Sequence, residues 1–192
     1  MTFSTVLTLL RIALAVGILP LLSSDRPEAW LTALLTFVLA GLTDWLDGFL
    51  ARRWHQTSPL GALLDPIADK ILVLGVLGML AWEGVIPAWI VWVIALREAI
   101  VTGARLLAAR KGAVLAAAKE GKWKAAMQMF GLGVFLLWGW LQASGDQAPF
   151  AGLLSTTWIV ANGLLYVSLV LTVASGISFF HRNAAILRNA LG

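Results

Sequence analysis

Residues 44–69 read DWLDGFLARRWHQTSPLGALLDPIAD and join two long apolar segments of the chain. Four aspartates lie in this stretch, one pair on each side of its turn-forming residues: Asp44, Asp47, Asp65 and Asp69. A carboxylate within a membrane-spanning helix is costly in free energy, so acids concentrated at the end of such a helix indicate a functional site. The stretch therefore predicts two membrane helices that meet at a cluster of acids.

The composition on either side of this stretch is that of a membrane protein. Of the 192 residues, 60% are apolar and 12% are charged, whereas about 25% are charged in an ordinary soluble domain. A crossing takes roughly 20 helical residues, and six apolar segments approach or exceed that length: 8–24, 30–51, 66–82, 86–109, 123–142 and 151–179. We predict an all-α integral membrane protein, a bundle of six transmembrane helices that forms one membrane-embedded catalytic domain over residues 1–192. Because Cys is absent, disulfides, thiolate nucleophiles and Cys-based metal sites are excluded.

The positive charges predict the orientation of this bundle. If the N-terminus is cytoplasmic, the Lys and Arg residues lie at cytoplasmic helix ends, and Arg26 alone lies outside, between Asp25 and Glu28. Such an asymmetry is typical of cytoplasmic loops. We therefore expect both termini and the acidic stretch to face the cytoplasm, and size and orientation favour a bacterial inner membrane.

The spacing of the acids favours a metal site. Asp44 and Asp47 lie about 60° apart on one helix, and Asp65 and Asp69 lie about 40° apart on the next. The connection between them returns to the same membrane surface, so the two pairs can face each other. Four carboxylates at one place repel one another unless a cation neutralises them. Oxygen ligands without His or Cys favour Mg²⁺, Mn²⁺ or Ca²⁺, and two metal ions with bridging carboxylates are a recurring arrangement in phosphoryl transfer.

Small residues alternate with these acids. Gly48 and Ala51 lie beside Asp47 and Arg52, and Gly61 lies in the connection. Small side chains let a ligand approach the backbone, which suits a flat base and a diphosphate. Arg52 offers a fork of donors that matches phosphate oxygens.

The whole pattern, Asp44-x2-Asp47-Gly48-x2-Ala51-Arg52-x8-Gly61-x3-Asp65-x3-Asp69, resembles the signature of the CDP-alcohol phosphatidyltransferase family. The resemblance implies a homodimeric enzyme of phospholipid biosynthesis, dependent on Mg²⁺ or Mn²⁺. Such an enzyme moves a phosphatidyl group from CDP-diacylglycerol to a small alcohol and releases CMP.

The resemblance also implies a role for each matching residue. The metal ligands would be Asp44, Asp47, Asp65 and Asp69. Asp69 would in addition act as the general base that activates the acceptor hydroxyl. The residues expected to bind CDP-diacylglycerol are Asp44, Gly48, Ala51, Arg52 and Gly61.

Basic residues near the expected cytoplasmic surface bear on the acceptor. A cluster of Arg and Lys exceeds what a neutral alcohol needs and predicts an acceptor that carries its own phosphate. The residues expected to contact that phosphate are Arg105, Arg110, Lys122, Lys124 and Arg182. Residues 97–100 (REAI) and 121–124 (GKWK), with Gln128, resemble the phosphatidylglycerophosphate-forming branch of the family, whose acceptor is sn-glycerol 3-phosphate.

Arg97 and Glu98 lie inside the apolar segment 86–109, where an unpaired charge would be costly. Two interpretations stay open. The residues form a buried pair or network that holds helices together, or they contact the substrate directly.

Two other functions compete with this prediction. The same chemistry with a different acceptor would make the protein a cardiolipin synthase or a phosphatidylinositol phosphate synthase. Intramembrane acids also line ion pathways, so a small ion transporter is the alternative from another class. We expect no nucleic-acid partner.

Overall fold

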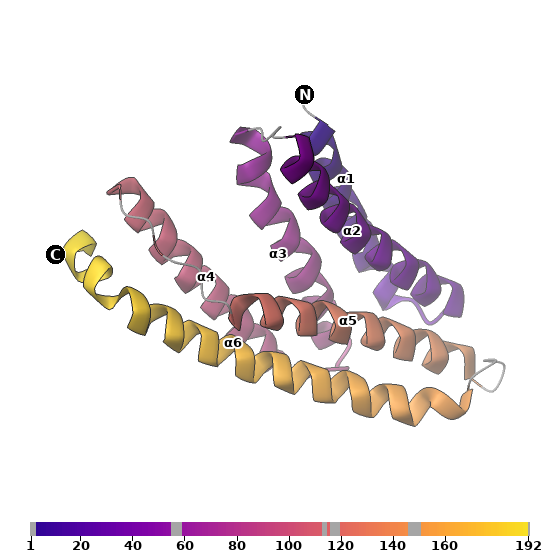
Figure 1. Cartoon of the computed structure of the whole chain (residues 1–192). Coiled ribbons are helices and arrows are strands. Elements are labelled where there is room, and N and C mark those ends of the chain that lie inside the picture. The colour runs from indigo at the N-terminus through magenta and orange to yellow at the C-terminus, as the bar shows by residue number, and fades with distance from the viewer. Residues whose placement is uncertain (1–2, 55–58, 113–114, 116–119, 146–150, 192) are drawn as a thin grey trace.

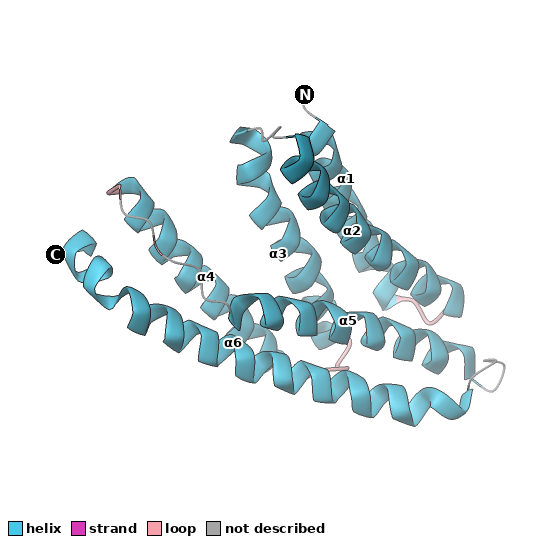
Figure 2. Ribbon diagram, viewed as in Figure 1, coloured by secondary structure: helices cyan, strands magenta, loops and turns pink. Residues whose placement is uncertain are grey.

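The computed structural model describes residues 3–54, 59–112, 115, 120–145 and 151–191, and every regular element within them is helical (Figures 1 and 2). Its α-helices are α1 (Phe3–Ile18), α2 (Pro27–Trp54), α3 (Pro59–Trp82), α4 (Ala88–Arg110), α5 (Glu120–Ser144) and α6 (Leu154–Leu191). Short 3-10 helices, η1 (Leu19–Ser23) and η3 (Ala151–Leu153), follow α1 and precede α6. The predicted all-α class is confirmed.

Each apolar segment overlaps one of these helices, but the helices around the acidic connection are longer than the segments. The helix α2 continues to Trp54, and α3 begins at Pro59 rather than near residue 66. Proline suits the first position of a helix because its backbone lacks an N–H that would have no partner there. Pro27 begins α2 in the same way. All four aspartates of the 44–69 stretch therefore lie on regular helix.

The packing of the helices closes into a ring. Helix α1 packs against α2 and α3, α2 against α5, α5 against α6, α6 against α4, and α4 against α3. Figure 1 shows α1, α2 and α3 side by side, with α5 and α6 running antiparallel along another side. One close approach is made by Trp30 of α2, whose ring covers Gly139 of α5; a Cβ at Gly139 would lie 2.0 Å from the ring.

Apolar and polar side chains separate along this bundle. The buried apolar core includes Ala40 of α2, Leu72 of α3, Ile94 of α4, Leu132 of α5 and no charged residue among the described ones. Charged side chains come just beyond these positions: after Ala40 on α2, before Leu72 on α3, after Ile94 on α4 and before Leu132 on α5. Successive helices run in opposite directions, so these positions gather at one end, which we call the polar end.

The outer surface of the helices is apolar. Among the described residues, three segments are long and apolar enough to cross a membrane: Thr5–Ser23, Trp123–Ser144 and Leu154–Ile186. Large side chains such as Leu35, Trp92 and Ile159 are exposed along the bundle, as expected for a surface that faces lipid. These features fit a membrane protein.

Candidate functional site at the polar end

The first cluster of the polar end joins three helices through one guanidinium group. Arg11 of α1 places Nη1 2.9 Å from Oδ1 of Asp44 on α2 and 3.2 Å from Oδ1 of Asp69 on α3. The Arg11 side chain is fully buried, whereas the side chains of Asp44 and Asp69 are 53% and 54% exposed. The two carboxylates therefore share one positive charge on the protein side, and about half of each side chain is exposed on the other side.

The sequence of α1 explains why Arg11 points inward. Thr5, Thr8, Arg11, Ala15 and Ile18 are all buried, and they recur at intervals of three or four residues. Such spacing places them on one face of the helix, which packs against α2 and α3. Arg11 lies in the middle of that face and so reaches the acids of both neighbours.

The two carboxylates fit the binding of a hard divalent cation. They come from different helices, converge on one point and offer only oxygen ligands, the kind that Mg²⁺ and Mn²⁺ prefer. Among the side chains that the structure describes, no group of three or more acids or histidines could hold a metal. The predicted ligands Asp47 and Asp65 lie outside the described side chains, although their backbone belongs to α2 and α3.

The predicted nucleotide site also has its residues outside the described side chains. These residues are Gly48, Ala51, Arg52 and Gly61. Their backbone places the first three on α2, beyond Asp44, and the last on α3, two turns before Asp69. Their roles stay predictions.

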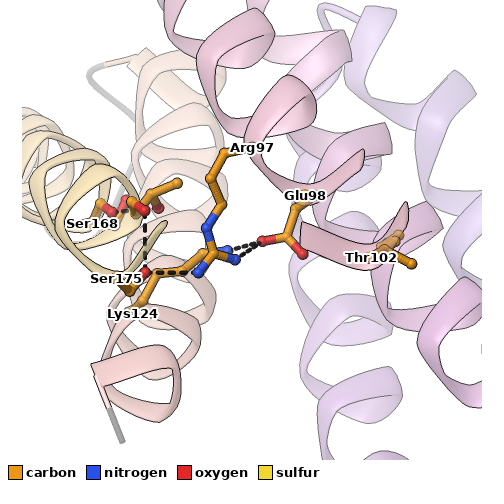
Figure 3. Close-up of polar contacts among 8 residues, drawn as sticks. Arg97, Glu98, Thr102, Lys124, Ser168 and Ser175 are labelled. Carbon is orange, nitrogen blue, oxygen red and sulfur yellow. Dashed lines mark hydrogen bonds and ion pairs between the residues drawn. The ribbon is translucent and has the colours of Figure 1, made fainter. Parts of the chain in front are cut away.

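The second cluster of the polar end ties α4 to α5 and α6 (Figure 3). Arg97 of α4 donates from Nη1 to Glu98 Oε1 and from Nη2 to Ser175 Oγ of α6, each at 2.8 Å. Lys124 of α5 pairs with the same Glu98 oxygen. The side chains of Arg97, Glu98 and Lys124 are 17%, 22% and 7% exposed. We call these four residues the Glu98 network.

Two adjacent residues of α6, Ser175 and Gly176, accommodate the Arg97 side chain. The Ser175 hydroxyl donates to the backbone carbonyl of Thr172 at 3.1 Å, so its oxygen is free to accept from Arg97. The next residue is Gly176, where an added Cβ would lie 3.3 Å from Arg97 Cγ. A small residue here lets the Arg97 stem lie directly on α6.

The other predicted acceptor residues are arranged differently from Lys124. Arg105 is exposed, with its guanidinium carbon 5.3 Å from the centre of the Phe179 ring, a distance typical of a cation–π contact. Arg110 and Arg182 are exposed. The side chain of Lys122 lies outside the described part. The structure thus brings Lys124 into a network with Glu98, and it records no contact that joins Arg105, Arg110 and Arg182 to one another among the described residues.

A sequence model of the CDP-alcohol phosphatidyltransferase family matches residues 1–174, which is most of the chain. The chain belongs to this family. The match covers α1 to α5 and the first part of α6. It includes every residue of the two polar clusters except Ser175, which is the first residue beyond it.

Two named relatives are similar over most of the chain, and a third over a shorter part. A protein from Bacillus subtilis named CDP-diacylglycerol–glycerol-3-phosphate 3-phosphatidyltransferase is 37% identical over 164 residues, covering 85% of this chain and 79% of the relative. A protein of the same name from Cereibacter sphaeroides is 38% identical over 136 residues, covering 69% of this chain and 62% of the relative. A cardiolipin synthase (CMP-forming) from Streptomyces coelicolor is 44% identical over 81 residues, covering 42% of this chain and 37% of the relative.

Arg11 is a residue of the candidate site that the sequence pattern did not single out. In the sequence it counts only among the basic residues of the expected cytoplasmic side. The available signal was its position in the stripe formed by Thr5, Thr8, Ala15 and Ile18. A charged residue in the middle of such a stripe is buried by its helix and needs an opposite charge nearby.

Proposed function

We propose that the protein transfers the phosphatidyl group of CDP-diacylglycerol to sn-glycerol 3-phosphate, which yields phosphatidylglycerophosphate and CMP. The observation that carries the proposal is the pairing of two clusters at one end of the bundle. Half-exposed carboxylates at Arg11 suit the metal-bound diphosphate of the donor, and the basic Glu98 network suits an acceptor with a phosphate. Relatives that bear the corresponding name match 69% and 85% of the chain.

In this proposal, the chain's own residues position the acceptor and move its proton. Asp69 accepts the proton of the glycerol hydroxyl as that oxygen attacks the phosphatidyl phosphorus, and the bond from this phosphorus to the oxygen of CMP breaks. Arg11 keeps Asp69 in place from the protein side. Asp44, Asp47, Asp65 and Asp69 would hold two ions of Mg²⁺ or Mn²⁺, and these ions would supply charge neutralisation for the diphosphate and the departing CMP.

The proposal extends to the membrane arrangement. Six crossings with both termini in the cytoplasm would place the polar end at the cytoplasmic surface of a bacterial inner membrane. The donor's acyl chains would stay among the exposed apolar side chains of the helices, while its headgroup reaches the carboxylates. The protein would act as a homodimer, as the family resemblance implies.

The direct test of the function is CMP release by purified protein in detergent, with CDP-diacylglycerol and Mg²⁺ or Mn²⁺. We expect release with sn-glycerol 3-phosphate and none with serine or inositol phosphate. The 44% identity of the cardiolipin synthase segment makes phosphatidylglycerol the acceptor to compare. Release with phosphatidylglycerol alone would overturn the proposed acceptor and keep the reaction class.

The basic residues allow a sharper test of the acceptor. Arg105→Ala and Lys122→Ala are each expected to raise the KM for glycerol 3-phosphate about tenfold, because each removes a charge expected at the phosphate. The KM for CDP-diacylglycerol should stay within about twofold in the same assays. Lys111→Ala is the matched control, since Lys111 is exposed at the end of α4 and has no proposed substrate contact. If the acceptor KM is unchanged in both variants, these residues set the membrane orientation or bind lipid and do not contact the acceptor.

A further inference from the structure

The Glu98 network shows how Arg97 and Glu98 are used, which the sequence left open between a structural and a substrate role. Glu98 Oε1 accepts from Arg97 on its own helix and pairs with Lys124 on α5, and Arg97 also donates to Ser175 on α6 (Figure 3). Glu98 thereby joins α4 to α5, and Arg97 joins α4 to α6. Among the described residues, the Glu98–Lys124 ion pair is the recorded side-chain link between α4 and α5.

Among the described side chains of this region, positive charges outnumber negative ones. Arg97 and Lys124 carry two positive charges against the one negative charge of Glu98. Lys70 of α3 adds another positive charge nearby, because its Nζ donates at 2.7 Å to Thr102, which lies one turn after Glu98 on α4. A partly buried site with excess positive charge favours an anion.

Arg97 is held from two sides and so is less mobile than a free arginine. Its Nη1 and Nη2 donate to Glu98 and Ser175, and its stem lies against Gly176. Its Nε is buried and has no hydrogen-bond partner among the described residues. Lys124 differs, because its ammonium group has three N–H donors and Glu98 is its one recorded partner among the described side chains. Within that part of the chain, two donors of Lys124 remain for a ligand.

We propose that Glu98 is a positioning residue that holds Lys124 at the phosphate of the acceptor, and that Arg97 acts through Glu98 rather than on the substrate. This inference rests on the proposed function. Ser175 on α6 holds Arg97, Arg97 holds Glu98, and Glu98 holds Lys124 on α5. The flexible lysine stem is thereby fixed before the substrate arrives, and preorganisation of this kind increases affinity for the bound ligand.

The kinetic test replaces Glu98 with Gln. Without the carboxylate, Arg97 and Lys124 repel each other and Lys124 leaves its position. We expect the KM for glycerol 3-phosphate to rise about tenfold, while kcat and the KM for CDP-diacylglycerol change less than about twofold. Glu98→Asp keeps the charge and should restore much of the acceptor affinity. Glu83→Gln is the matched control, because Glu83 is an exposed acid that contacts Ser23 outside the polar end.

A double-mutant cycle separates this role from a general loss of packing. In a Lys124→Met background, Glu98→Gln should add no further increase in acceptor KM, because the residue through which Glu98 acts is already gone. An additive increase would overturn the proposal. So would an equal rise in the KM values of both substrates, which would indicate a structural role.

A second readout does not depend on turnover. Lys124 is 7% exposed, so its amine should react slowly with an acylating reagent such as N-hydroxysuccinimide acetate, as measured by mass spectrometry of the detergent-solubilised protein. Glu98→Gln should speed this labelling at least about fivefold, whereas Glu83→Gln should not change it. If labelling responds and wild-type protein releases no CMP with glycerol 3-phosphate, the positioning of Lys124 stands and the proposed acceptor fails. Unchanged labelling of Lys124 in Glu98→Gln would overturn the positioning role.

Discussion

Replacing Asp69 with Asn is expected to lower kcat by about 10³-fold, a loss typical for removal of a positioned general base. Asn preserves the size of the side chain and leaves a carbonyl oxygen for Arg11, which contacts Asp69 at 3.2 Å. It removes the group that accepts the proton of the acceptor hydroxyl. The measurement is CMP release at saturating CDP-diacylglycerol and glycerol 3-phosphate, with purified protein that elutes as the wild type does in size-exclusion chromatography.

Asp25→Asn provides the control for this substitution. Asp25 is an exposed acid that precedes α2, outside the polar end, and its replacement should leave kcat unchanged. A kcat for Asp69→Asn within about tenfold of the wild-type value would remove Asp69 from the role of general base. The carboxylates at Arg11 would then serve only to bind cation and donor.

The helices could be predicted from the sequence because long apolar segments with short breaks leave few alternatives. Their ends at the acidic connection could not, because an apolar pattern marks the part of a helix that is suited to lipid. Polar residues continue α2 to Trp54, and Pro59 begins α3 ahead of its apolar segment. Whether the six helices cross the membrane stays a prediction.

The meeting of Asp44 and Asp69 followed from the sequence, because both pairs of acids were expected at one membrane surface. The structure brings these two residues to a common partner, and their metal and base roles stay predictions. The Glu98 network could not be derived in this way. Adjacent residues on a helix point about 100° apart. The pairing of Arg97 with Glu98 and Ser175, and of Glu98 with Lys124, therefore depends on how the long Arg97 side chain folds back between the helices.

Replacing Arg11 with Met should lower kcat by about 100-fold, because Asp44 and Asp69 lose the anchor that they share and small displacements of reacting groups are costly. Met is of similar length and suits a buried site. The substitution also removes the buried Nε and Nη2 of Arg11, which have no hydrogen-bond partner among the described side chains. Part of the desolvation cost of the guanidinium is thereby relieved, and the variant should fold.

The same substitution should enlarge the increase in Tm that Mn²⁺ produces. The positive charge of Arg11 lies against two of the expected metal ligands and opposes a cation there, so its removal should tighten cation binding to the folded protein. Each tenfold gain in affinity adds about 1.4 kcal/mol of stability at saturating metal. The measurement compares Tm in EDTA and in Mn²⁺ for the wild type and for Arg11→Met.

Two further variants make this comparison specific to the charge at the carboxylates. Arg26→Met removes an exposed arginine outside the polar end and should leave the response to Mn²⁺ as in the wild type. Arg11→Lys keeps the charge but lacks the planar fork, so it should respond to Mn²⁺ like the wild type while its kcat falls. Equal Mn²⁺ responses in the wild type and in Arg11→Met would show that the cation does not share Asp44 and Asp69 with Arg11. A larger Mn²⁺-induced increase in Tm in Arg11→Met alone would mean that Arg11 is the counter-ion of these acids in the absence of metal and that its charge weakens metal binding.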